Sequence, residues 1–165
     1  MPAPLAERLR PHTLDEYIGQ EHLVGKEGVF RKFFETGNVP SFILWGPPGV
    51  GKTTLAKLVS STLERPFYTL SAVTSGVKEV REVIETAKRQ HLFNQKPPFL
   101  FIDEIHRFNK SQQDSLLGAV EQGIVTLIGA TTENPSFEVI SPLLSRCQVY
   151  ILNPMDDGDL QKLLD

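Results

Sequence analysis

Short apolar runs alternate along the chain with longer segments in which apolar residues recur at every third or fourth position. Largely continuous apolar runs are typical of strands buried on both faces of a sheet. They predict strands at 42–45, 67–70, 99–102, 124–128 and 148–152. The periodic segments predict helices at 28–35, 52–63, 77–91, 111–122 and 156–165. This alternation indicates an α/β fold, with a five-stranded, mostly parallel sheet covered by helices on both faces.

Three stretches lack a clear period. Residues 1–22 mix apolar and polar positions around Pro11 and predict an ordered arm or short helices. Residues 131–142 are polar and contain proline, which favours a loop with a short turn. The helix at 156–165 stops with the chain after fewer than three turns, which indicates a protein that continues further.

The composition narrows the possible classes of protein. With 165 residues the chain is long enough for one well-buried domain, and its net charge of −3 gives no overall basic excess, so any DNA contact must be local. Cys147 is the only cysteine, which excludes an internal disulfide and a cysteine-based zinc site. The sequence shows no signal peptide and no apolar stretch that could span a bilayer, so we expect a cytoplasmic protein without membrane partners.

A phosphate-binding motif follows the first predicted strand. Gly46, Gly51, Lys52 and Thr53 match the pattern G-x-x-x-x-G-K-[ST]. In such a loop the glycines let backbone N–H groups close around phosphates, the lysine supplies a cation and the threonine hydroxyl binds Mg²⁺. The helix predicted at 52–63 adds the positive end of its dipole. The motif therefore predicts a site for ATP and Mg²⁺.

An acidic pair follows the strand predicted at 99–102. Asp103 and Glu104 should emerge at the carboxyl edge of the sheet, where ligands bind in open α/β folds. Phosphoryl transfer needs a carboxylate near the metal and a group that orients or deprotonates the attacking water. We assign Asp103 to the metal, together with Thr53, and Glu104 to the water.

Other polar residues near strand ends are candidates for the same chemistry. Residues 131–134 follow a buried strand, so the hydroxyls of Thr131 and Thr132 or the amide of Asn134 could reach the γ-phosphate or the attacking water. Arg146 suits the charge that spreads over a transferring phosphoryl group, although a surface salt bridge is the alternative. His106 could act as a base, but a single histidine in a polar turn is more often structural.

Together these motifs resemble the core of an AAA+ ATPase of the branch that contains clamp loaders and Holliday-junction motors. Within that branch the chain is most similar to the replication-associated recombination protein A (MgsA) family, whose eukaryotic relative is the Werner-helicase-interacting ATPase. The matching stretches are 4–11 (PLAERLRP), 19–23 (GQEHL), 43–49 (ILWGPPG), 103–110 (DEIHRFNK), 128–135 (IGATTENP) and 145–147 (SRC).

The resemblance implies three regions and a set of site residues. The regions are an arm at 1–22 that contributes to the adenine site, an ATPase core at 23–153 and the start of a helical lid at 154–165. The residues implied for the nucleotide are Arg10, Pro11 and Ile18 in the arm and Gly46, Pro47, Pro48, Gly49, Val50, Gly51, Lys52, Thr53 and Thr54 in the loop. Thr132, with Asn134 as the alternative, takes the role of first sensor. Arg146 takes the role of an arginine finger that acts on ATP bound by a neighbouring subunit.

The resemblance also implies a biological role. It implies an ATPase of the bacterial cytosol or nucleoid that self-associates and acts on DNA at replication forks or recombination intermediates. Clamp loaders carry an asparagine that restrains the catalytic glutamate, and Ser71 stands at that position here. Because the lid and the oligomerisation region lie beyond residue 165, this chain alone is expected to hydrolyse ATP slowly. The alternatives are a clamp-loader subunit, a branch-migration motor or a non-hydrolysing ATP-binding subunit.

Overall fold

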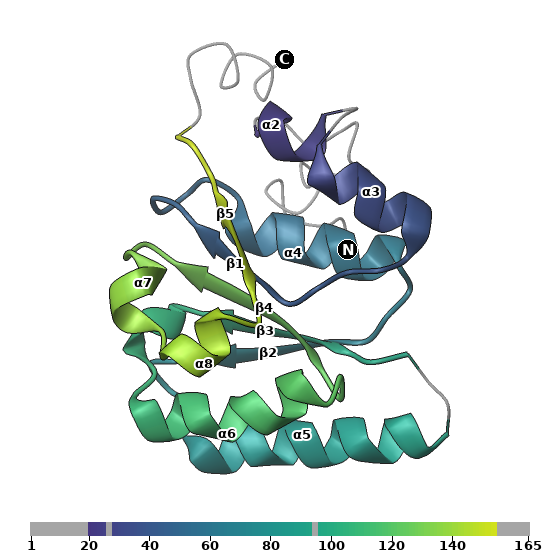
Figure 1. The fold of residues 1–165 in the computed structure, drawn as a ribbon, viewed down its shortest axis with the longest axis vertical. Helices are drawn as coiled ribbons and strands as arrows, with labels where there is room; N and C mark the ends of the chain where they lie inside the picture. Colours follow the sequence, from purple (N-terminus) through teal and green to yellow (C-terminus); the bar gives the residue numbers. More distant parts are fainter. Residues whose placement is uncertain (1–19, 26–27, 94–95, 155–165) are drawn as a thin grey trace, which may run out of the picture.

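Five parallel strands form one sheet, in the order β2-β3-β4-β1-β5 (Figure 1). The computed structural model describes residues 20–25, 28–93 and 96–154. The strands are β1 (Phe42–Trp45), β2 (Phe67–Ser71), β3 (Phe99–Asp103), β4 (Thr126–Thr131) and β5 (Gln148–Ile151). The predicted five-stranded sheet is therefore confirmed, and every strand pair in it is parallel.

Helices cover both faces of the sheet, as predicted. In Figure 1, α3 and α4 lie over one face while α5 and α6 lie over the other. The helices are α2 (Glu21–Val24), α3 (Val29–Thr36), α4 (Lys52–Thr62), α5 (Val77–Leu92), α6 (Lys110–Glu121), α7 (Pro135–Glu138) and α8 (Ser141–Leu144). Successive strand residues point to opposite faces, so Leu44 packs in the core beneath α3 and α4 and Ile43 in the core beneath α5 and α6.

The structure corrects the expected bounds of the fourth strand. Strand β4 begins at Thr126 and not at Ile124, because the N–H groups of Ile124 and Val125 bond to the carbonyl of Ala119 and close the end of α6. The strand then continues to Thr131 through small residues that fit between β3 and β1. The apolar residues had suggested limits at 124 and 128, whereas the backbone hydrogen bonds set the limits of the strand at 126 and 131.

The segment expected to be a loop with a turn contains two short helices. Asn134 caps α7, where its side chain accepts the Ser136 N–H at 3.0 Å. Proline occupies the first turn of α7 and of α8, a position that needs no backbone N–H. The prediction of a loop with a short turn over 131–142 was therefore wrong in its detail, because proline begins helices as well as ending them.

Predictions at both ends of the chain lie largely outside the described residues. These are the arm at 1–19, with Arg10, Pro11 and Ile18, and the helix at 156–165. At Gln20, the first residue described, the side-chain amide donates to the Asn153 carbonyl and accepts the Asn153 N–H, at 2.6 and 2.8 Å. Gln20, directly before α2, is thus bound to the chain just after β5.

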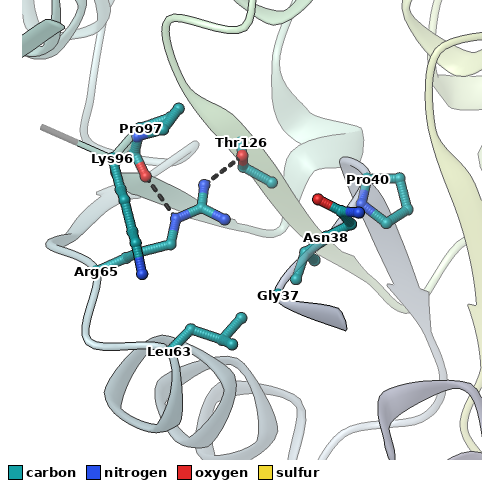
Figure 2. A pocket seen from close by; sticks show the side chains of 9 residues that line it. Gly37, Asn38, Pro40, Leu63, Arg65, Lys96, Pro97 and Thr126 are labelled. Atoms are coloured by element: carbon teal, nitrogen blue, oxygen red, sulfur yellow. Dashed lines mark hydrogen bonds between the residues drawn. The ribbon is translucent and has the colours of Figure 1, made fainter. Parts of the chain in front are cut away.

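Arg65 joins three segments at the amino edge of the sheet (Figure 2). Its guanidinium donates to the Pro97 carbonyl at 2.6 Å and to the Thr126 hydroxyl, and it stacks on Phe99 with 3.9 Å to the ring centroid. Burial lowers the pKa of Arg65 to about 10. The charge therefore persists at neutral pH and is held by neutral partners.

We expect Arg65→Met to lower the free energy of unfolding by about 2 kcal/mol, because it removes two charge-assisted hydrogen bonds from a half-buried group. Urea unfolding of the chain measures the change. Arg89→Met on the exposed face of α5 is the matched control and should change stability by less than about 0.5 kcal/mol. Equal effects of the two substitutions would show that the Arg65 contacts contribute nothing.

Candidate functional site

A cleft of about 450 Å³ opens at the carboxyl edge of the sheet, where β1, β3 and β4 end. It brings together the phosphate-binding motif, the acidic pair and one predicted threonine, which lie far apart in sequence. Its lining residues are Pro48, Gly49, Gly51, Lys52, Thr53, Thr54, Asp103, Glu104, Thr131 and Thr132. The parallel sheet therefore assembles most of the predicted site residues in one place.

The loop between β1 and α4 has the backbone that the motif requires. Gly51 adopts φ of 90°, a left-handed conformation that glycine reaches without strain, and α4 begins at the next residue. A side chain at Gly46 would clash, because a Cβ there would lie 2.8 Å from the Leu152 carbonyl oxygen. The N–H groups of the loop and of the first turn of α4 together form a binding site for an anion.

Lys52 supplies a cation to this loop. Its Nζ donates to the carbonyls of Gly46 and Pro47, at 2.6 and 3.3 Å, so the side chain folds back over the loop. Burial lowers the pKa of Lys52, and the nearby charges of Asp103 and Glu104 act in the opposite direction. The cleft thus contains a partly buried cation balanced by carboxylates.

The acidic pair lies opposite this lysine. Asp103 ends β3, and its Oδ1 accepts the Glu104 N–H at 3.0 Å. Glu104 has φ of 54°, which is unusual for a residue with a side chain. Its Oε2 lies 3.1 Å from Arg107 Nε, and the two side chains are 43% and 58% exposed. An ion pair this open to water is weak, so the Glu104 carboxylate can leave it at little cost.

The residues present fit a magnesium ion. Mg²⁺ takes oxygen ligands and in nucleotide sites uses one or two protein groups plus phosphate oxygens and water. Thr53 and Asp103 both line the cleft and offer a hydroxyl and a carboxylate. Within the described ranges no cluster of three or more His, Cys, Asp and Glu side chains forms a metal site built from protein alone.

The two candidates for the first sensor occupy different places. Thr132 is exposed and lines the cleft. Asn134 lies outside the lining, and its side chain caps α7. Geometry favours Thr132, although the sensor role itself stays a prediction.

Arg146 lies at the opposite edge of the sheet. It precedes β5, where the Gln148 N–H bonds to Ser41, the residue before β1. Five residues of extended chain, about 16 Å at 3.3 Å each, separate Ser41 from the start of the phosphate loop at Gly46. Arg146 Nε pairs with Glu121 Oε1 at 3.1 Å, and Nη1 donates to the Pro142 carbonyl at 2.7 Å. Arg146 is therefore remote from the cleft of its own chain.

Sequence reasoning missed several contacts of the site. Thr131, one of the two threonines named after this strand, lines the cleft, but its bond to His106 was not predicted. Arg107 pairs with Glu104, while the Ser71 hydroxyl accepts the Val73 N–H at 3.3 Å. Nothing in the sequence indicated the side-chain pairing of Arg107.

Burial excludes a reactive thiol beside Arg146. It raises the pKa of Cys147 to about 12, so the thiol stays protonated at neutral pH.

Among the helices of the described part of the chain, none has the length and apolar character needed to cross a membrane.

Comparison with known proteins identifies close relatives. Residues 42–155 match the model of the ATPase family associated with various cellular activities (AAA). Replication-associated recombination protein A of Escherichia coli K12 is 52% identical over 161 residues, which are 98% of this chain and 36% of that protein. The ATPase WRNIP1 of Dictyostelium discoideum is 52% identical over 98% of this chain and 18% of its own length. The chain thus spans about a third of the bacterial relatives it matches.

A solved structure shares the fold. The Holliday junction branch migration motor RuvB of Thermotoga maritima superimposes with a TM-score of 0.76 at 33% identity, covering 94% of this chain and 52% of RuvB.

Proposed function

This chain belongs to the AAA family of ATPases, and from that premise we propose that it is the ATP-hydrolysing core of a protein that acts on DNA in replication or recombination. The single observation that carries the proposal is the cleft that unites Lys52 and Thr53 with Asp103 and Glu104. The first pair suits phosphate binding, and the second suits water activation beside a metal.

Binding of ATP uses the loop and the start of α4. The backbone N–H groups around Gly49 and Gly51 face the phosphates, and Lys52 exchanges its two loop carbonyls for phosphate oxygens. Thr53 and Asp103 would hold a magnesium ion, which would supply positive charge to neutralise the phosphates. Arg10, Pro11 and Ile18 remain the proposed residues for the adenine.

Hydrolysis uses Glu104 from this chain. Its carboxylate accepts a proton from water as the water oxygen bonds to the γ-phosphorus, and the bond to the ADP oxygen breaks with its electron pair remaining on ADP. For this step the carboxylate has to leave Arg107. Thr132 lies in the same cleft and orients the water or the γ-phosphate.

The second positively charged side chain of the site, besides Lys52, comes from a neighbouring subunit. Arg146 lies at the amino edge of its own sheet, so it acts on ATP held by a neighbour, and an active site consists of two copies of the chain. This arrangement requires self-association. The contacts of Arg146 with Glu121 and with the Pro142 carbonyl are exposed, so a neighbouring subunit can replace them at little cost.

The DNA-related role rests on the relatives. Identity of about 50% to replication-associated recombination proteins favours a role of that kind over branch migration, since RuvB is 33% identical. Intact Lys52, Thr53, Asp103 and Glu104 argue against a subunit that binds ATP without hydrolysing it.

We expect Lys52→Ala to weaken ATP binding by about 10- to 100-fold, because one charge-assisted contact to the phosphates is lost in a partly buried site. Titration with a fluorescent ATP analogue measures the affinity. Lys57→Ala on the exposed side of α4 is the control and should bind as the wild type does. Equal affinity of all three proteins would place the nucleotide elsewhere.

A further inference from the structure

Thr131 is a junction between three segments of the proposed site. It is 2% exposed and ends β4. Its carbonyl accepts the N–H of Gly46, the first residue of the phosphate loop, at 3.1 Å. Its hydroxyl oxygen accepts the Glu133 N–H at 2.9 Å, which closes a turn around Thr132. The same hydroxyl lies 2.9 Å from His106 Nδ1.

His106 belongs to the turn that follows the acidic pair. It lies in the 3₁₀ turn Ile105–Arg107, directly after Glu104. Ile105 is fully buried, and its side chain packs so closely on Gly129 of β4 that a Cβ at Gly129 would lie 3.1 Å from Ile105 Cδ1. This turn therefore touches β4 twice, through Ile105 packing and through the His106 hydrogen bond.

The hydrogen bond can form with either histidine tautomer. With the ring proton on Nε2, the Thr131 hydroxyl donates to Nδ1. With the proton on Nδ1, the ring donates to Oγ1 and the hydroxyl can donate to the Glu133 carbonyl at 3.2 Å. The link between the two side chains therefore holds with either tautomer.

We propose that His106 and Thr131 are positioning residues for hydrolysis, whose hydrogen bond fixes the turn that carries Glu104 relative to the turn that carries Thr132. The inference rests on the proposed function, since it assigns those two residues to the attacking water. Neither His106 nor the Thr131 side chain is among the groups proposed to hold the phosphates. Loss of the link therefore disturbs catalytic geometry and leaves nucleotide binding intact.

The test compares variants of the full-length protein. His106→Phe keeps a ring and removes the hydrogen bond, and Thr131→Val keeps the shape and removes the hydroxyl. Each should lower kcat for ATP about tenfold, as expected when one buried hydrogen bond no longer supports the transition state, with ATP affinity within about twofold of wild type. The double variant should be no slower than Thr131→Val alone, because that variant already lacks the bond to His106 together with the bond to the Glu133 N–H.

Two further variants separate positioning from stability. His106→Asn places an amide atom where Nδ1 lies and should restore kcat to within about threefold of wild type. Thr126→Val makes the same substitution at the other end of β4, where the hydroxyl accepts from Arg65. It should lower the free energy of unfolding and leave kcat unchanged.

Three results would overturn the inference: wild-type kcat in His106→Phe, additive losses in the double variant, or equal losses of kcat in Thr126→Val. Each of these can occur while Glu104→Gln is inactive, in which case the proposed function stands and the link fails. Turnover retained in Glu104→Gln would instead contradict the proposed function itself.

Discussion

Replacing Arg146 with alanine is expected to lower ATP turnover of the full-length protein by about 10³- to 10⁵-fold, the worth of an arginine finger in phosphoryl transfer. The reason is geometric: Arg146 lies at the amino edge of the sheet and the cleft at the carboxyl edge, so in the proposed mechanism the residue acts on ATP bound by a neighbouring subunit. A phosphate-release assay measures the loss. ATP affinity at each site should change little, since the finger acts on charge that develops during transfer.

A matched control substitution tests whether the loss of turnover is specific to Arg146. Arg89→Ala removes an exposed arginine from α5 and should leave turnover unchanged. Sedimentation of both variants checks that assembly is retained, because an assembly defect would also remove the finger. If an assembled Arg146→Ala protein hydrolysed ATP at the normal rate, Arg146 would have only a structural role, in the salt bridge with Glu121.

Glu104→Gln should reduce turnover by about 10²- to 10⁴-fold and leave ATP binding intact. The amide keeps the size of the side chain but cannot accept the proton of the attacking water. Single-turnover hydrolysis and nucleotide titration, taken together, separate the two effects. Glu133→Gln is the control, since it alters an exposed acid beside Thr132 that does not line the cleft.

The outcome also tests the division of work within the acidic pair. If Glu104→Gln bound ATP weakly and still turned it over when saturated, Glu104 would belong to binding and Asp103 would have to supply the base. The expected result leaves Asp103 with the metal, where it ends β3 and faces Lys52 across the cleft.

Local patterns predicted the parts of the site that depend on neighbours in sequence. The spacing of Gly46, Gly51, Lys52 and Thr53 fixes a loop before a helix, and an apolar run before Asp103 places that carboxylate at a strand end. Because all strands are parallel, these ends meet at one edge without further information. Fold class and most cleft residues follow from these facts.

Contacts that depend on register and rotamers could not be predicted in this way. The bond between His106 and Thr131 requires the 3₁₀ turn after β3 to reach the last residue of β4. The pairing of Glu104 with Arg107 follows from the left-handed backbone at Glu104, which no spacing pattern signals. The start of α7 depends on capping by Asn134, and α8 has a proline in its first turn, so apolar period signals neither helix.

Mixing two inactive variants tests the central claim, an ATPase site shared between subunits, most directly. Arg146→Ala subunits keep Glu104, and Glu104→Gln subunits keep Arg146. In a random mixture of equal amounts, about one quarter of the interfaces in a cyclic assembly pair an intact cleft with an intact finger. We predict that phosphate release recovers to about that fraction of the wild-type rate. Mixed assemblies that remain as inactive as either variant alone would contradict the shared site.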